Sequence, residues 1–371
     1  MRRPSLRTSS RSSLFLALGL WPLVLSFTSC SPTYVLRAGY EEARILWRRQ
    51  PIERLLQDPA IEATTRTKLE TVLAAREFAR NTLHLRVDHS YATFAQVDAD
   101  QVVHVVSAAY RDRLEPYTWW FPIIGRVPYK GFFSPSAAAQ EASALEHKGY
   151  DTFVRPAVAF STLGWFADPL PSNLLRYDRA VLASVVIHEL LHSTSYLAGR
   201  ADFDESFATF VGDRGALEFF AARNDTVAVR ELGALWADAL QFSQFMGQFT
   251  GELRTAYAAG LPTEQRQDVF TKAQSDFNQL RFLTHLYADF GAQPLNNAVI
   301  LHYAMYADRL QLFEDLYRQQ NAEVGRTIEV VLDALKARPD DPFAAVQTRL
   351  QAPAAAALLP SADVATTVMA R

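Results

Sequence analysis

The spacing of apolar residues changes along the chain and predicts three parts. In the first part, residues 32–98, apolar positions recur at helical intervals. The clearest run lies between about residues 65 and 83 and includes Leu69, Val72 and Phe78. Because residues three or four positions apart share one face of a helix, this part is predicted to consist of helices.

The second part, residues 100–166, is rich in β-branched and aromatic residues, with proline and glycine between the runs. This pattern predicts a small sheet with strands at residues 101–106, 118–125, 127–133 and 151–160. A short helix is expected at residues 136–148, because Gly149 follows it as glycine commonly follows the last residue of a helix.

The third part, residues 178–340, has helical spacing almost throughout. The expected helices are residues 178–199, 204–222, 226–260, 263–290 and 295–336. Asp178 is the expected N-cap of the first helix, and Gly199 its expected C-cap. The tail, residues 341–371, contains an alanine- and proline-rich run and is predicted to be disordered.

These patterns predict an α+β fold that is mostly α-helical, with a small mixed sheet preceding a helical C-terminal half. Residues 30–340 are expected to form one domain. The chain has 371 residues, 49% of them hydrophobic and 21% charged, which is typical of an ordered protein. The net charge is −3, with 37 Lys and Arg against 40 Asp and Glu, so the composition gives no basic surface for nucleic acid.

The N-terminus has the pattern of an export signal. Four arginines and no acidic residue precede an apolar run at residues 14–27, which is shorter than the roughly 20 residues that a spanning helix needs. The segment from Leu25 to Cys30 resembles a bacterial lipobox, in which the cysteine becomes the mature N-terminus and carries lipid. Phe27 stands where the lipobox usually has an aliphatic residue.

Cys30 is the only cysteine in the sequence, which fits lipidation better than a disulfide. We therefore expect residues 1–29 to be removed as a signal peptide. The mature protein would be a lipoprotein, anchored through Cys30 to the outer membrane and facing the periplasm. The alternative is an ordinary cleaved signal with an incidental cysteine.

The sequence His188-Glu189-Leu190-Leu191-His192 is the motif that predicts chemistry. On a helix, the two histidines point to one side and can bind one Zn²⁺ at about 2.0–2.1 Å each. Glu189 lies one position further around and can accept a proton from a water without binding the ion. A chain of this composition contains such a motif by chance on the order of 0.01 times. The alternative is a helix with two ordinary histidines and a solvated glutamate.

A catalytic zinc site needs a third protein ligand and one open position for water. The downstream candidates are the carboxylates Asp202, Asp204, Glu205, Asp213 and Glu218. We predict Glu205, because a new helix that begins after the turn at Gly199 can fold back and present its first turn to the histidines. Asp204 is the alternative ligand, or else an N-cap. Glu205 itself could instead be a first-turn carboxylate stabilised by the helix dipole.

These segments resemble a family of bacterial lipoproteins described as putative aminopeptidases, which are zinc peptidases similar to the thermolysin-like gluzincins. The resemblance covers nearly the whole mature chain, and matching stretches include residues 119–133, 160–170, 188–192, 205–210 and 295–298. It implies a zincin-like fold in which His188, His192 and Glu205 bind one zinc ion and Glu189 is the general base.

The chain departs from this family at two places. Where the family commonly has a cysteine pair, this chain has Trp120 and Arg126, so no structural disulfide is expected there. The family often has asparagine before the distal glutamate, where this chain has Asp204, a second carboxylate beside the predicted site.

Further residues are candidates for substrate contacts. Tyr306 and Tyr303 are candidate donors to an oxyanion, and Tyr306 fits the corresponding helix of the family better, although either can be a packing residue. Residues 159–164 can form an edge strand that pairs with an extended peptide, or else a buried strand. Asn296 and Asn297 are expected to cap a helix or to line the site.

The predicted reaction is hydrolysis of a peptide bond in a peptide or protein substrate, with Glu189 as the base and Tyr306 as an assisting residue. The family resemblance implies an aminopeptidase. One alternative is an inactive, lipid-anchored binding or envelope-assembly protein that keeps the zincin fold. Another is a zinc hydrolase that acts on a different amide, such as a cell-wall peptide.

Overall fold

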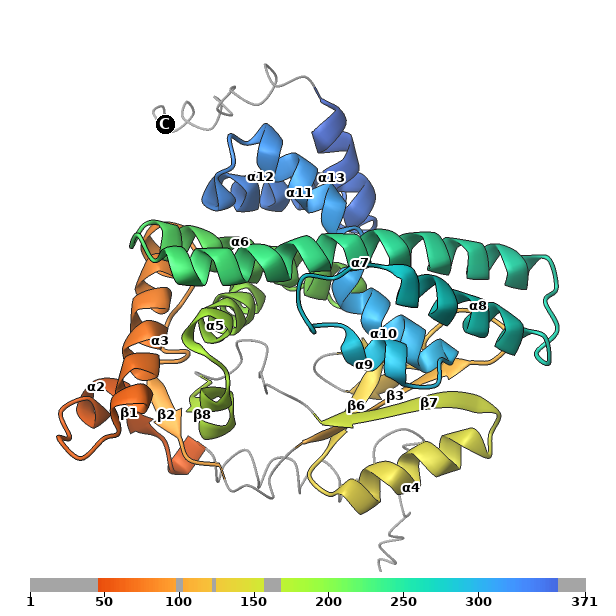
Figure 1. Cartoon of the computed structure of the whole chain (residues 1–371), viewed down its shortest axis with the longest axis horizontal. Helices are drawn as coiled ribbons and strands as arrows, with labels where there is room; N and C mark the ends of the chain where they lie inside the picture. Colours follow the sequence, from red (N-terminus) through yellow and green to blue (C-terminus); the bar gives the residue numbers. More distant parts are fainter. Residues whose placement is uncertain (1–45, 98–102, 122–124, 157–167, 353–371) are drawn as a thin grey trace, which may run out of the picture.

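The computed structural model describes residues 46–97, 103–121, 125–156 and 168–352, and it is mostly helical with small sheets (Figure 1). The predicted α+β class is confirmed at this level. No helix among these residues is both long and apolar enough to cross a bilayer. The helices are α2 (Ile52–Leu55), α3 (Ala63–Asn81), α4 (Pro135–Glu146), the 3-10 helix η1 (Ser172–Arg176), α5 (Arg179–Thr194), α6 (Ala201–Ala221), α7 (Thr226–Ala258), α8 (Arg266–Gln279), α9 (Ala288–Ala292), α10 (Asn297–Ala307), α11 (Leu310–Gln319), α12 (Val324–Ala337) and α13 (Pro342–Gln351).

The strands form three small sheets. They are β1 (Gln50–Pro51), β2 (Thr93–Ala95), β3 (His104–Tyr110), β4 (Trp119–Phe121), β5 (Gly125–Val127), β6 (Tyr129–Phe132), β7 (Tyr150–Pro156) and β8 (Leu170–Pro171). One sheet has the order β1-β2-β8 and includes a parallel pair, β2 with β8. A second is the hairpin β4-β5, and the third is antiparallel, in the order β6-β3-β7.

The β6-β3-β7 sheet lies between two helices. Its central strand β3 directs Val106 to one face, where it belongs to the same apolar cluster as Ala138 of α4. On the other face, the ring of Phe153 on β7 lies 5.2 Å from the ring of His302 on α10. Since successive side chains of a strand point to opposite faces, the odd-numbered positions of β7 all face α10.

The predicted strand at residues 127–133 is two strands. Val127 ends β5, which pairs with β4, whereas Tyr129 begins β6, which pairs with β3. Pro128 separates them, because proline has no backbone N–H to donate to a ladder.

Helix α5 carries the His-Glu-x-x-His sequence and is buried on most sides. Asp178 caps its N-terminus as predicted, since the carboxylate accepts the backbone N–H groups of Ala180 and Val181 at 2.9 and 3.0 Å. The prediction of Gly199 as the C-cap is wrong. The helix ends at Thr194, and Ser195 is extended with φ −139° and ψ 122°. Gly199 lies instead in the following turn, with φ +80°.

Two predicted long helices are broken. Residues 263–290 form α8 and α9, because the loop between them bends to Asp238, whose carboxylate accepts the backbone N–H groups of Leu283 and Thr284 at 2.7 Å each. Residues 295–336 form α10, α11 and α12. The first break lies at Arg309, whose left-handed backbone has φ +52°.

The predicted disordered tail begins too early. Residues 342–351 form α13, so the ordered part of the chain extends past residue 340. The carboxylate of Asp341 caps this helix at Ala344, and Pro342 occupies its first turn, where no N–H is needed. Phe343 and Val346 are buried in the main apolar cluster. Residues 353–371 lie outside the described part of the chain.

Helix α6 packs very closely against α5 through glycine. A Cβ atom at Gly212 would lie 2.8 Å from the carbonyl oxygen of Ser184 and 2.9 Å from the Cβ of His188. One turn of helix further on, a Cβ at Gly215 would lie 3.1 Å from Ile187. The two helix backbones can therefore approach only because these positions have no side chain.

We predict that Gly212→Ala destabilises the protein, because the added methyl group meets backbone atoms that no side-chain rotation can move. The expected net loss in the free energy of unfolding is on the order of 1 kcal/mol, measured by urea denaturation. Gly233→Ala in α7 is the matched control, since a Cβ there has no neighbour within 4 Å. The control is expected to gain about 0.5–1 kcal/mol. Equal stability of Gly212→Ala and the wild type would contradict the close-packing account.

Candidate metal centre

His188 and His192 lie one turn apart on α5 and direct the same ring atom to the same place. Their Nε2 atoms are 3.2 Å apart. The ring centroids are 5.0 Å apart and the ring planes are inclined by 77°, so the rings meet edge to face instead of stacking. The His188 side chain is 17% exposed and that of His192 is 5% exposed, which leaves the pair sheltered but reachable from solvent.

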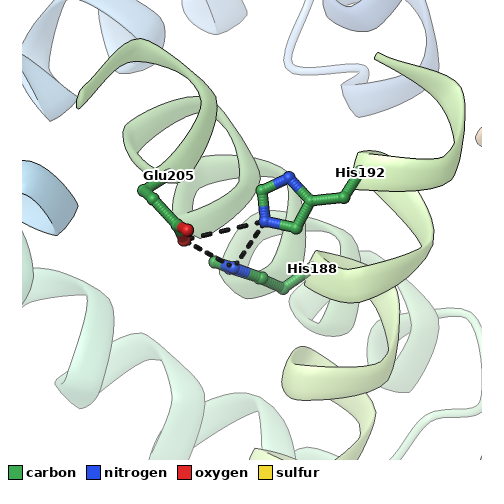
Figure 2. Close-up of side chains that lie close together, drawn as sticks. All are labelled: His188, His192 and Glu205. Atoms are coloured by element: carbon green, nitrogen blue, oxygen red, sulfur yellow. Dashed lines mark hydrogen bonds and ion pairs between the residues drawn. The ribbon is translucent and has the colours of Figure 1, made fainter. Parts of the chain in front are cut away.

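Glu205 completes the group from the neighbouring helix (Figure 2). Its Oε2 lies 3.3 Å from Nε2 of His188 and 3.6 Å from Nε2 of His192. Ligand atoms bound to a tetrahedral zinc at about 2.0–2.1 Å lie about 3.3–3.4 Å from one another. The three observed separations therefore agree with the edges of such a tetrahedron, with one corner left for water or substrate.

Asp204 has a different role from Glu205, although the two are adjacent. Both carboxylate oxygens of Asp204 accept the backbone N–H of Leu197, at 3.1 and 3.0 Å. Burial raises the Asp204 pKa to about 7, against the opposing effect of this hydrogen bond. Asp204 thus fastens the turn between α5 and α6, and that turn places Glu205 opposite the histidines.

The electrostatics of the three side chains favour a cation between them. Burial by itself would lower the pKa of His192, but the hydrogen bond and charge of Glu205 prevail and raise it to about 9. Burial by itself would raise the pKa of Glu205, but hydrogen bonds from His188 and His192 hold it below its ordinary range. The metal-free site therefore keeps a proton on His192 where a metal ion would bind.

Glu189 lies beside this group without belonging to it. Burial raises the pKa of Glu189, the charges of His188 and His192 oppose the rise, and the charge of Glu205 adds to it. A glutamate whose pKa is raised toward neutrality is a better proton acceptor than an ordinary one. The position and environment of Glu189 thus suit a general base.

The two candidate tyrosines of α10 lie in different surroundings. Burial and then the charge of Glu205 raise the pKa of the Tyr306 hydroxyl, and Arg155 opposes this rise. Tyr303 instead accepts a hydrogen bond from Gln293 at 3.1 Å, and its ring packs against that of Phe290 at 5.1 Å. The structure therefore places Tyr306 beside the candidate centre and Tyr303 in an apolar cluster.

Several residues near the centre were not predicted from the sequence. The pKa of Tyr129, on β6, is raised by burial and then by the charges of Glu205 and other neighbouring groups. The pKa of Tyr196, in the turn after α5, is raised by burial and then by the charges of Asp204 and Glu205. Nothing distinguishes them among 14 tyrosines in the sequence, because strand β6 and the turn meet only in the folded protein.

Other predicted residues are structural or lie outside the described part. Asn296 caps α10 by accepting the backbone N–H of Val299 at 2.9 Å. Asn297 is fully buried and donates to the backbone carbonyl of Tyr110 at 2.8 Å. Cys30, the predicted signal at residues 1–29 and the predicted edge strand at residues 159–164 are not among the described residues.

The fold and the site together define the class: a mostly helical α+β protein with a His–His–Glu group arranged as metal ligands. Residues 33–342 match the model of the family described as "Putative aminopeptidase", and the chain belongs to that family. The family resemblance predicted from the sequence is confirmed at this level. No curated protein and no solved structure matches the chain.

We predict that Glu205→Gln lowers zinc affinity, whereas Asp204→Asn lowers stability. Glu205→Gln removes a charged ligand, so zinc affinity should fall by roughly 100-fold or more, measured by competition with a chelator. Asp204→Asn should keep one zinc per chain but lower the unfolding temperature, because the Leu197 N–H loses its carboxylate acceptor. Loss of zinc in Asp204→Asn with retention in Glu205→Gln would reverse the assignment of the ligand.

Zinc affinity is also predicted to rise with pH. The metal-free protein holds a proton on His192 because its pKa is raised to about 9, and zinc must displace that proton. The apparent affinity should therefore rise by about tenfold per pH unit from neutral pH and level off above the raised pKa. The measurement is titration in buffers of fixed free zinc; an affinity independent of pH across this range would contradict the protonated pair.

Proposed function

We propose that this protein is a zinc-dependent peptidase with a zincin-like fold and a gluzincin type of site, in which His188, His192 and Glu205 bind one Zn²⁺. The observation that carries the proposal is the convergence of the three ligand atoms at 3.2, 3.3 and 3.6 Å. Membership in a family described as aminopeptidases supports peptide-bond hydrolysis as the reaction.

A bound zinc ion would supply a Lewis acid that makes a water nucleophilic and polarises the scissile carbonyl. Glu189 takes a proton from the attacking water while the water oxygen bonds to the carbonyl carbon. Glu189 then gives that proton to the leaving nitrogen as the carbon–nitrogen bond breaks, and the products are a carboxylic acid, which releases its proton to solvent, and an amine. The hydroxyl of Tyr306 donates a hydrogen bond to the carbonyl oxygen as negative charge develops there.

The substrate is proposed to be a peptide or protein outside the cytoplasm. The sequence pattern at residues 1–29 supports export, and the family match begins at residue 33, three positions after Cys30. We therefore propose a lipoprotein anchored through Cys30 in the outer membrane and facing the periplasm. Mass spectrometry of the mature N-terminus distinguishes a lipidated Cys30 from an unmodified one, and the unmodified form would refute the anchor.

The general-base assignment predicts that Glu189→Gln keeps zinc but loses turnover. Removing a positioned base lowers kcat by about 10²–10⁴-fold, whereas the three metal ligands are unchanged. The measurements are zinc content and the hydrolysis of both aminoacyl anilides and an unfolded protein, which also separates exopeptidase from endopeptidase activity.

Glu218→Gln is the matched control for this experiment. Glu218 lies on α6 and accepts the backbone N–H of Val324 at 2.8 Å, away from the metal ligands. The control should lose stability but keep zinc and turnover. Full turnover in Glu189→Gln would refute its role as the base. A zinc-loaded wild type that cleaves neither substrate would favour an inactive, binding function.

A further inference from the structure

Ser206 lies on α6 directly after the candidate ligand Glu205, and its side chain is fully buried. Its hydroxyl donates to the backbone carbonyl oxygen of Met305 on α10 at 3.0 Å. A serine inside a helix commonly donates to the carbonyl four residues earlier in its own helix. A hydroxyl has only one hydrogen to donate, so Ser206 uses it to join two helices.

The carbonyl of Met305 requires a donor from outside its own helix. The last four carbonyl groups of an α-helix lack an N–H four residues further along, and that of Met305 is among them because α10 ends at Ala307. Arg309, four residues after Met305, has a left-handed backbone with φ +52° and does not continue α10. Met305 is buried, and a buried carbonyl without a donor is unfavourable. Ser206 therefore supplies the hydrogen bond that α10 cannot make itself.

Both ends of this hydrogen bond are covalently next to a residue of the candidate site. The peptide unit between Met305 and Tyr306 is planar, so the carbonyl that Ser206 holds and the backbone N–H of Tyr306 move together. At the other end, the backbone of Ser206 continues directly from that of Glu205. The bond thus fixes the backbone of Tyr306 on α10 relative to the backbone of Glu205 on α6.

We propose that Ser206 is a positioning residue that sets the distance between the Tyr306 side chain and the metal ligands. The inference rests on the proposed peptidase function, in which the Tyr306 hydroxyl stabilises negative charge on the substrate carbonyl oxygen. Such a donor is effective where it is fixed in advance, and a misplacement of about 1 Å can cost on the order of 100-fold in rate. In this role Ser206 contacts neither the metal ion nor the substrate.

A second buried serine, Ser243 on α7, provides the matched control. Its hydroxyl oxygen accepts the backbone N–H of Leu310, at the start of α11, at 3.1 Å. Ser243→Ala therefore also removes one buried hydrogen bond between helices. The bond lost in this control lies beyond the break at Arg309 and does not involve the peptide unit of Tyr306. A loss of stability alone would affect both serine variants alike.

A double-mutant cycle tests the proposal in the zinc-loaded, full-length protein. Ser206→Ala should keep one zinc per chain and a KM within about threefold, but lower kcat by about 10–100-fold, as for partial loss of an oxyanion donor. When Tyr306 is already Phe, the same change should alter kcat by less than about twofold, because no hydroxyl remains to be positioned. Ser243→Ala should keep kcat. If the effects of Ser206→Ala and Tyr306→Phe multiply, or if Ser243→Ala lowers kcat equally, the proposal is overturned.

Ser206→Cys separates the hydrogen bond from the volume of the side chain. The thiol fills the space of the hydroxyl but is a weak donor, so kcat should fall toward that of Ser206→Ala. This variant also tests the proposal if Ser206→Ala does not fold. A kcat equal to that of the wild type in Ser206→Cys would show that packing alone is needed at this position and would overturn the proposal.

A second readout depends on neither turnover nor metal. With 3-fluorotyrosine incorporated at position 306, Ser206→Ala should shift or broaden the ¹⁹F resonance of the metal-free protein, and Ser243→Ala should leave it unchanged. An unchanged resonance in Ser206→Ala would overturn the proposal even in an active enzyme. Conversely, a shifted resonance in a protein that cleaves no peptide when loaded with zinc would support the positioning of Tyr306 by Ser206 while the proposed peptidase function fails.

Discussion

The close approach of α5 and α6 is the constraint on which the candidate centre depends. Two ligands lie on one helix and the third on the next, so an error of about 0.5 Å between the helices would separate the ligand atoms. Gly212 allows the backbones to meet next to His188, and Asp204 fastens the connecting turn at Leu197. The residues that position the candidate metal ligands are therefore a glycine and a carboxylate that are not part of the His–His–Glu group themselves.

A second set of contacts joins the sheet to this helix pair. Asp151 on β7 is bound by Arg266 of α8 and by the backbone N–H of Asn297, at the start of α10. This buried carboxylate fixes the strand and the helix relative to each other. Tyr306 lies more than two turns further along α10, so its place beside Glu205 depends on a charge network distant from the metal ligands.

The sequence predicts the parts of this structure that depend on local spacing. The five-residue motif, its helix and the Asp178 cap follow from periodicity and capping rules, and Glu205 follows from the length of the turn. The spacing of apolar residues does not reveal Tyr129 or Arg155, because each reaches the site only through the pairing of strands. The spacing of apolar residues also misplaces helix ends. The helices break at Ser195 and Arg309, where neither residue interrupts the apolar pattern in the sequence. The alanine-rich run that follows α13 makes the apolar residues of this helix look like the start of a disordered tail.

The turn from Ser195 to Arg200 has a further consequence, for the rate at which metal enters and leaves. The ion would bridge the two helices that this short segment connects, so a metal-bound protein resists local opening there, whereas the metal-free protein opens more readily. Release of a bound ion would then need only the opening of these six residues and not unfolding of the domain. The Asp204–Leu197 hydrogen bonds hold this segment closed, so stronger bonds would keep a bound ion in place longer.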